Sequence, residues 1–292
     1  MTKRFEIGSV ITAMVTPFKE DLTIDYNALE KLVHHLINNG SDTILVAGTT
    51  GESPTLTHKE ELDLLKAVKE ISQGRVKIMM GAGSNCTQTA AEQSKRVAAL
   101  GVDAILSVVP YYNKPSQEGM IKHFGDIAKS VNLPIMLYNI PGRTGVNMLP
   151  ETIAAIAEEN KTIFAVKQSN GDLDQVSEIV SLVPDGFDVF SGDDSLTLPM
   201  MALGAAGVVS VASHIIGSEI KEMIELFKAG KVQEAKDLHI KLYPVFKKIF
   251  MAPNPTPIKC ALANRGILND FVRSPLVSLN SKQREELLAI TQ

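Results

Sequence analysis

Short runs rich in Val, Ile and Ala recur along the chain, and a segment with helical periodicity follows each of them. The runs are nearly continuous in hydrophobicity, which is typical of parallel strands that are buried on both faces. Their starts lie about 18 to 34 residues apart, the spacing of repeated strand–helix units. We therefore expect eight strands, at residues 9–16, 42–48, 76–83, 104–110, 134–141, 163–167, 187–191 and 206–211.

The segments between these runs carry helix signals. Thr57 and Glu60 have the spacing of a capping box, and Pro150 suits the first turn of a later helix. Gly40 follows the last apolar residue of an amphipathic stretch and marks its end. That stretch presents one apolar face, formed by Leu29, Leu32, Val33, Leu36 and Ile37.

Eight successive strand–helix units predict an α/β protein with a closed (β/α)₈ barrel. An open doubly wound sheet is the alternative, but no Gly-rich dinucleotide loop follows the first strand. We expect residues 1–214 to form the catalytic barrel core. Residues 215–292 exceed one closing helix, so we expect additional C-terminal helices, broken at residues 254–257 and packed as an appendage of the same domain.

Composition narrows the class of protein. The 292 residues carry 29 Lys and Arg against 33 Asp and Glu, for a net charge of −4, which disfavours nucleic acid or an anionic membrane as a partner. Two cysteines cannot form a disulfide framework and suit a reducing compartment. No signal-peptide pattern and no apolar run of about 20 residues is present. We therefore expect a cytoplasmic enzyme.

The active site of such a barrel lies at the carboxyl ends of its strands. Lys167 ends the sixth run, Ile-Phe-Ala-Val-Lys, where the surroundings are apolar. Loss of hydration disfavours an ammonium group and yields a neutral, nucleophilic amine, which can form an imine with a ketone. Alternatively, Lys167 extends out of the barrel mouth or pairs with a carboxylate.

Other strand ends offer supporting groups. Tyr138 ends the neighbouring fifth strand, so its phenol could exchange protons with an imine on Lys167, or it could simply line the barrel mouth. Arg143 follows in a loop and could bind a carboxylate. The glycines and threonines of residues 48–51 form a strand-to-helix turn whose N–H groups and hydroxyls suit a small anion, although the glycines alone also fit a tight turn.

A metal site is not expected. The six histidines lack metal-ligand spacing, and adjacent Asp193 and Asp194 lack a second ligand group nearby. We expect these two aspartates to cap the helix that follows.

Several motifs, in order along nearly the whole chain, resemble the dihydrodipicolinate synthase family of class I, pyruvate-dependent aldolases. They are Gly-Thr-Thr-Gly-Glu-Ser at residues 48–53, Pro-Tyr-Tyr-Asn-Lys-Pro at 110–115, Tyr-Asn-Ile-Pro-Gly-Arg-Thr at 138–144, Val-Lys at 166–167, Ser-Gly-Asp-Asp at 191–194, Gly-Val-Val-Ser-Val at 207–211 and Asn-Pro-Thr-Pro-Ile-Lys at 254–259.

The resemblance implies a lyase of lysine and diaminopimelate biosynthesis that needs no cofactor. Pyruvate would form an imine with Lys167, and its enamine would attack L-aspartate 4-semialdehyde. The motifs match Thr49, Tyr138 and Tyr112 to the proton relay of the family, with Tyr112 reaching the active site of a neighbouring subunit. They match Thr50 and Val209 to pyruvate binding and Arg143 to the second substrate's carboxylate. A homotetramer is implied.

The sequence also permits other classes of protein. N-acetylneuraminate lyases share the barrel and the lysine, but Gly-Thr-Thr-Gly at residues 48–51 and Arg143 favour the synthase. An aldolase for another sugar acid, a metal-dependent aldolase and a non-catalytic 2-keto acid sensor are further possibilities. The lysine-effector positions of the family differ here at Pro54, Glu61 and Thr89, so we expect weak or absent feedback inhibition by lysine.

Overall fold

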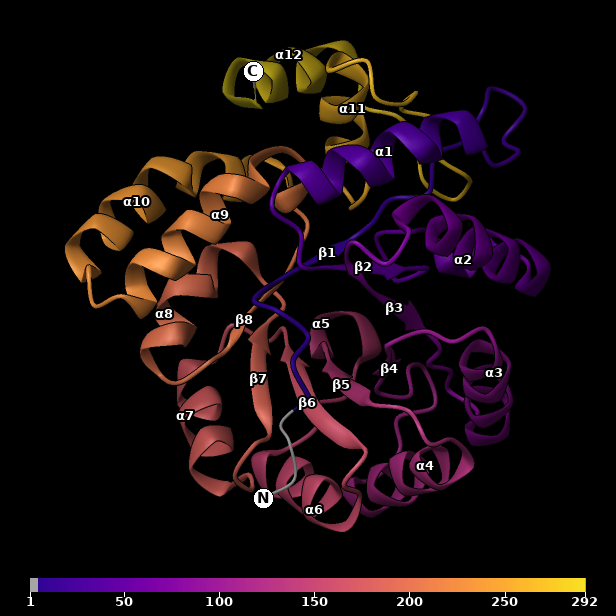
Figure 1. The fold of residues 1–292 in the computed structure, drawn as a ribbon, viewed down its shortest axis with the longest axis vertical. Coiled ribbons are helices and arrows are strands. Elements are labelled where there is room, and N and C mark those ends of the chain that lie inside the picture. Colours follow the sequence, from indigo (N-terminus) through magenta and orange to yellow (C-terminus); the bar gives the residue numbers. More distant parts are fainter. Residues whose placement is uncertain (1–4, 292) are drawn as a thin grey trace. The chain divides into compact units, whose positions relative to one another are not determined.

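The computed structural model describes residues 5–291, and its strands follow one another in sequence order around a closed barrel (Figure 1). All the pairings with an assigned register are parallel. The predicted (β/α)₈ fold is confirmed. The strands are β1 (Val10–Ala13), β2 (Thr43–Val46), β3 (Lys77–Gly81), β4 (Ala104–Val108), β5 (Ile135–Asn139), β6 (Ile163–Gln168), β7 (Asp188–Ser191) and β8 (Gly207–Ser210).

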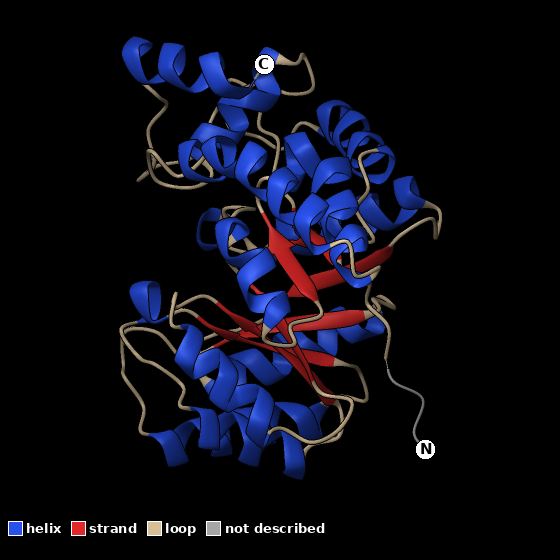
Figure 2. Ribbon diagram, turned by 90° about the vertical axis from the view of Figure 1, so that its left-hand side faces the viewer, coloured by secondary structure: helices blue, strands red, loops and turns tan. Residues whose placement is uncertain are grey.

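Helices alternate with the strands and continue after β8 (Figure 2). They are α1 (Tyr26–Asn38), α2 (His58–Ser72), α3 (Thr87–Ala99), α4 (Gln117–Ser130), α5 (Pro141–Thr144), α6 (Pro150–Glu159), α7 (Leu173–Leu182), α8 (Thr197–Ala202), α9 (Ser213–Lys228), α10 (Val232–Lys248), α11 (Thr256–Asn264) and α12 (Ser281–Thr291), with 3₁₀ turns η1 (Ser53–Thr55) and η2 (Asp194–Leu196).

The described residues divide into two compact units. Residues 5–8 and 78–209 form the first, which we call the Lys167 unit. Residues 9–77 and 210–291 form the second, which we call the Thr50 unit.

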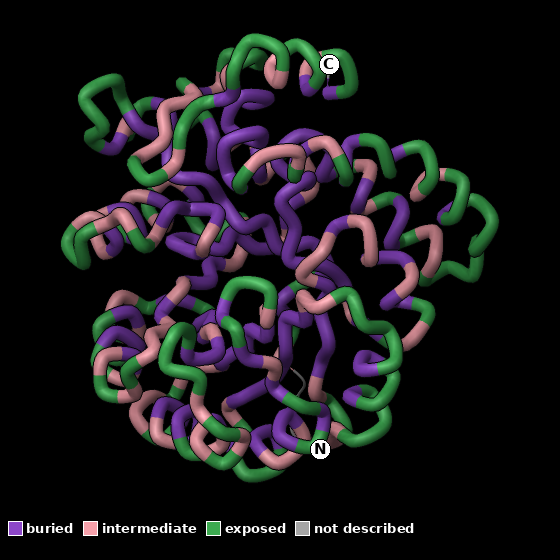
Figure 3. Tube along the Cα trace, turned by 180° about the vertical axis from the view of Figure 1, so that it is seen from behind, coloured by how far each residue is buried: buried purple, intermediate pink, exposed green. Residues whose placement is uncertain are grey.

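The Lys167 unit is a parallel sheet covered by helices. Its helices α3, α4, α6 and α7 pack against one another in chain order. The strand residues are mostly buried. Along the helices, buried and exposed positions alternate (Figure 3). Each residue of β6 is buried, as the continuous apolar run predicts.

The Thr50 unit joins the first two strands to the C-terminal helices. Helix α9 packs against β1, α1, α10 and α11, and α12 packs against α10 and α11. The apolar face predicted for α1 is buried at Leu29, Leu32, Val33 and Leu36. The capping box at Thr57 is present at the start of α2.

Two local expectations differ from the structure. Except for β6, which extends one residue beyond its predicted run, the strands are shorter than these runs. For example, β5 ends at Asn139 because Pro141 begins α5. Asp193 occupies the N-cap position of η2, but its side chain makes no capping hydrogen bond, so that cap prediction was wrong. The Asp193 carboxylate instead accepts a hydrogen bond from Ser195 Oγ.

Candidate active site

Lys167 and Tyr138 lie directly opposite each other on neighbouring strands. The register of β5 and β6 pairs Tyr138 with Lys167, as the sequence predicts. Both residues are buried, with exposed fractions of 6% for Tyr138 and 7% for Lys167. The Nζ of Lys167 lies 4.1 Å from the centroid of the Tyr138 ring. This arrangement brings the aromatic ring of the tyrosine against a buried amine.

The surroundings of Lys167 depend on Phe190 and Gly192. Phe190 of β7 pairs with Lys167 on the other side of β6 and is itself buried. At Gly192, a Cβ atom would lie 2.8 Å from Lys167 Cε and would overlap Ser169 Oγ. A larger residue at position 192 would therefore force the side chains of Ser169 and Lys167 to move, and the glycine leaves them their present space.

A buried amide network fixes the residues that follow Tyr138 and Lys167. Asn139 Nδ2 donates to Gln168 Oε1 at 3.1 Å and to Asn147 Oδ1 at 2.9 Å. Asn139 Oδ1 accepts from the N–H of Met148. Gln175 extends the network by accepting from Asn147 Nδ2. The Asn139–Gln168 bond therefore links the ends of β5 and β6 through side chains as well as through the sheet.

Tyr112 lies in a loop that contacts α5, the short helix in which the structure places Arg143 instead of a loop. The N–H of Tyr112 donates to the carbonyl of Thr144, the residue after Arg143. Tyr112 has a φ of 73°, which is unfavourable for a bulky residue, and its side chain is 89% exposed. Arg143 is exposed within α5. Both side chains are thus available to a substrate or a second chain.

The other three predicted site residues are divided between the two units: Val209 belongs to the Lys167 unit, and Thr49 and Thr50 belong to the Thr50 unit. Val209 is buried in β8, one residue beyond the Val208–Ser191 pair. Thr49 and Thr50 belong to the Thr50 unit, in the loop between β2 and η1. Thr49 is half-buried and Thr50 is buried.

The loop at residues 48–53 is a pair of overlapping turns. The N–H of Gly51 donates to the carbonyl of Gly48, and the N–H of Glu52 donates to the carbonyl of Thr49. Of the N–H groups expected to bind an anion, that of Gly51 is therefore already used. Gly51 is held in turn by Thr16, whose hydroxyl donates to its carbonyl at 2.6 Å.

Glu52 of this loop forms a buried ion pair with Lys259, which the sequence alone did not predict. Lys259 Nζ donates to Glu52 Oε1 at 2.5 Å, and the side chains are 0% and 1% exposed. Glu52 Oε2 accepts from the N–H of Arg273, and Lys259 also donates to the carbonyl of Phe271. Burial lowers the pKa of Lys259 to about 8, and the nearby Glu52 carboxylate opposes this shift. Lys259 therefore remains protonated at neutral pH.

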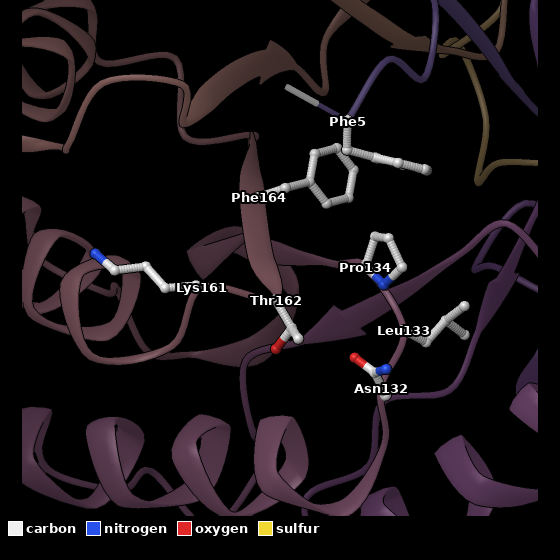
Figure 4. Close-up of a pocket in the computed structure, with 7 residues that line it drawn as sticks. All are labelled: Phe5, Asn132, Leu133, Pro134, Lys161, Thr162 and Phe164. Carbon is white, nitrogen blue, oxygen red and sulfur yellow. The ribbon is translucent and has the colours of Figure 1, made fainter. Parts of the chain in front are cut away.

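A separate pocket of the Lys167 unit lies at the other end of the same strands (Figure 4). Pro134 and Thr162 precede β5 and β6, whereas Tyr138 and Lys167 lie near the ends of these strands. The rings of Phe5 and Phe164 meet edge to face, with centroids 4.9 Å apart. The pocket is therefore distinct from the lysine site. It is lined by Phe5, Asn132, Leu133, Pro134, Lys161, Thr162 and Phe164.

Two features are absent from residues 5–291. No group of three or more His, Cys, Asp or Glu side chains is arranged to hold a metal ion. Over the same residues, none of the helices has the length and hydrophobicity needed to span a bilayer.

Sequence reasoning missed the polar residues that support the site. Asn139 and Gln168 directly follow Tyr138 and Lys167, so their place at buried strand ends was a usable signal. Glu52 and Lys259 lie inside quoted motifs, but 207 positions separate them, and no local pattern pairs such distant residues.

Comparisons with known proteins agree with this geometry. The chain is 52% identical over 281 residues to 4-hydroxy-tetrahydrodipicolinate synthase 1 of Halalkalibacterium halodurans, covering 96% of this chain and 95% of that protein. A crystal structure of a dihydrodipicolinate synthase from Bacillus anthracis is 47% identical, with a TM-score of 0.95 and coverage of 98% of both chains. The lysine-bound synthase of Cyanidioschyzon merolae is also 47% identical, with a TM-score of 0.96 and coverage of 99% and 98%.

The sequence model of one family matches residues 6–292, almost the whole chain. Its description, the dihydrodipicolinate synthetase family, agrees with the names of these relatives and with the motifs around Lys167 and Tyr138. The chain belongs to the dihydrodipicolinate synthetase family.

Proposed function

We propose that this chain condenses pyruvate with L-aspartate 4-semialdehyde to give 4-hydroxy-tetrahydrodipicolinate, the first committed step of lysine and diaminopimelate biosynthesis. The observation that carries the proposal is the buried Lys167 with Tyr138 opposite it, in a chain about half identical to synthases of this name. No observation favours a lyase of sugar acids over this reaction.

The chemistry begins with the Lys167 amine attacking the keto carbon of pyruvate. Loss of water gives an imine that is covalently bound to the enzyme. Removal of a methyl proton gives an enamine, whose carbon attacks the aldehyde of the second substrate. The amino group of that substrate then attacks the imine carbon, which closes the ring and releases Lys167. Each step before release needs a proton to be added or removed beside the nitrogen.

The contact between the Tyr138 ring and Lys167 Nζ supports Tyr138 as the residue that exchanges those protons. The family motifs support Thr49 and Tyr112 as further members of this relay. They also support Thr50 and Val209 as pyruvate-binding residues and Arg143 as the group that holds the carboxylate of the aldehyde substrate. A guanidinium suits that task because it can donate two parallel hydrogen bonds.

We propose a cytoplasmic homotetramer as the working assembly. The 89% exposed Tyr112 supports a contact with a neighbouring subunit, because a strained, solvent-facing tyrosine gains burial there. Sedimentation of the purified chain tests the assembly. Weak or absent feedback inhibition by lysine stays a prediction from Pro54, Glu61 and Thr89.

The imine is tested by reducing the enzyme with borohydride in the presence of pyruvate, followed by peptide mass spectrometry. We expect a reduced pyruvate adduct on Lys167 and irreversible loss of activity. Lys167→Ala should form no adduct and show no turnover. Lys161→Ala is the matched control, because Lys161 is an exposed lysine that precedes the same strand and should be dispensable.

The second substrate is tested in a coupled assay that compares L-aspartate 4-semialdehyde with a panel of sugar-acid precursors. Turnover with the semialdehyde alone is expected. Turnover by folded Lys167→Ala would contradict the mechanism, and a preference for a sugar-acid precursor would contradict the proposed substrate.

A further inference from the structure

One amide of the C-terminal region contacts the loop at residues 48–53, which we call the threonine loop. Asn254, in the segment between α10 and α11, is buried, and its Nδ2 donates to Thr50 Oγ1 at 2.9 Å. The other amide atom, Asn254 Oδ1, is buried and has no hydrogen-bond partner within residues 5–291. A buried carbonyl without a hydrogen-bond partner lowers the stability of the fold. The contact with Thr50 therefore explains this residue better than its own hydrogen bonding does.

The direction of this bond determines what Thr50 can do. A hydroxyl has one hydrogen to donate. Because Thr50 Oγ1 accepts from Asn254, its hydrogen is not used by the amide and has no acceptor among the described residues. Thr50 is thereby preset as a donor, which is the role that binding an anion requires.

Two other residues of the C-terminal region, Lys259 and Arg273, also fix the threonine loop. Glu52 has a φ of 55°, an unusual conformation for a residue with a side chain, and its carboxylate is fixed by Lys259 and by the N–H of Arg273. The loop that carries Thr50 is therefore fixed on both sides of Gly51. A donor that is held in one place does not lose freedom when a ligand binds, which strengthens binding.

We propose that Asn254 is a positioning residue for substrate recognition: it orients the Thr50 hydroxyl to donate to the carboxylate of the 2-keto acid. The proposal rests on the proposed function, which places a pyruvate carboxylate at Thr50. Asn254 itself need not touch the substrate. Its effect should therefore appear in pyruvate binding and be small in the later steps.

The test is the isosteric variant Asn254→Asp. A carboxylate in this place can only accept, so it takes the hydrogen of Thr50 and adds a charge that repels pyruvate. We expect the pyruvate concentration for half-maximal trapping by borohydride, and the KM for pyruvate, to rise about 10- to 100-fold, with a much smaller change in kcat. Methyl pyruvate, which has no carboxylate, should be trapped as in the wild type.

Asn264→Asp is the matched control, because it adds the same charge at an exposed position at the end of α11. It should leave both pyruvate constants unchanged. Unchanged trapping of methyl pyruvate also shows that the variant is folded and that Lys167 still reacts.

Two outcomes overturn the inference. A KM for pyruvate in Asn254→Asp equal to that of the wild type would mean that Thr50 does not depend on the amide. An equal loss of pyruvate and methyl pyruvate trapping would assign Asn254 a purely structural role. If wild-type Lys167 trapped no pyruvate, the proposed function would fail instead, so the two failures are distinguishable.

Discussion

Tyr138 contacts Lys167 through its ring, and in the proposed reaction its hydroxyl exchanges the protons. The ring covers the amine at 4.1 Å and shields it from water. The phenol hydroxyl adds a hydrogen-bond donor and acceptor at the edge of this ring. Removing the hydroxyl oxygen alone separates the contribution of the hydroxyl from that of the ring.

Tyr138→Phe keeps the ring and removes the hydroxyl. We expect kcat to fall about 10²- to 10⁴-fold, because proton transfers lose their positioned group, while the melting temperature stays nearly unchanged. Steady-state kinetics and calorimetry measure the two effects. Tyr243→Phe, at a half-exposed tyrosine of α10, should leave kcat unaltered. A kcat for Tyr138→Phe within twofold of the wild type would remove Tyr138 from the relay.

At the scale of elements, the sequence predicts where the strands lie but not which distant polar side chains bond to each other. Continuous apolar runs predicted the eight strands and placed Tyr138 beside Lys167, because consecutive strands of a barrel are neighbours. The bond between Asn254 and Thr50 joins residues 204 positions apart, and hydrophobic periodicity carries no information about such polar pairs. The strand ends that carry Tyr138 and Lys167 could therefore be predicted from the sequence. The hydrogen bond that supports Thr50 could be found only in the structure.

Helix α11 anchors the loop before α2 through the buried pair of Lys259 and Glu52. Lys259→Met should lower the free energy of unfolding by about 3–5 kcal/mol, because it leaves Glu52 buried without its cation. Calorimetric melting should show this as a clearly lower melting temperature. Lys122→Met breaks the exposed pair with Asp126 and should leave the melting temperature unchanged. Equal effects of the two variants would show that burial does not matter here.

For the whole molecule, the response to acid follows from histidines that are buried without charge. His214 Nδ1 lies 2.8 Å from the Val211 carbonyl, which can only accept, so Nδ1 carries the hydrogen. His214 Nε2 then accepts from the N–H of Val15 at 3.1 Å. A proton on Nε2 would break this bond. Burial lowers the pKa of His214 to about 4, and the same cause lowers that of His123 to about 4.

Acid should therefore destabilise the fold before carboxylates titrate. Below pH 6.5, the ordinary value for histidine, the unfolded chain binds a proton that folded His214 takes up only near pH 4. Stability from His214 is complete above pH 6.5 and is lost as the pH falls, by about 2 kcal/mol at pH 5. His214→Gln, whose amide oxygen can still accept from Val15, should show a smaller drop in melting temperature between pH 7 and 5. His58→Gln, at an exposed histidine, should keep the wild-type slope, and identical slopes for all three proteins would refute the assignment.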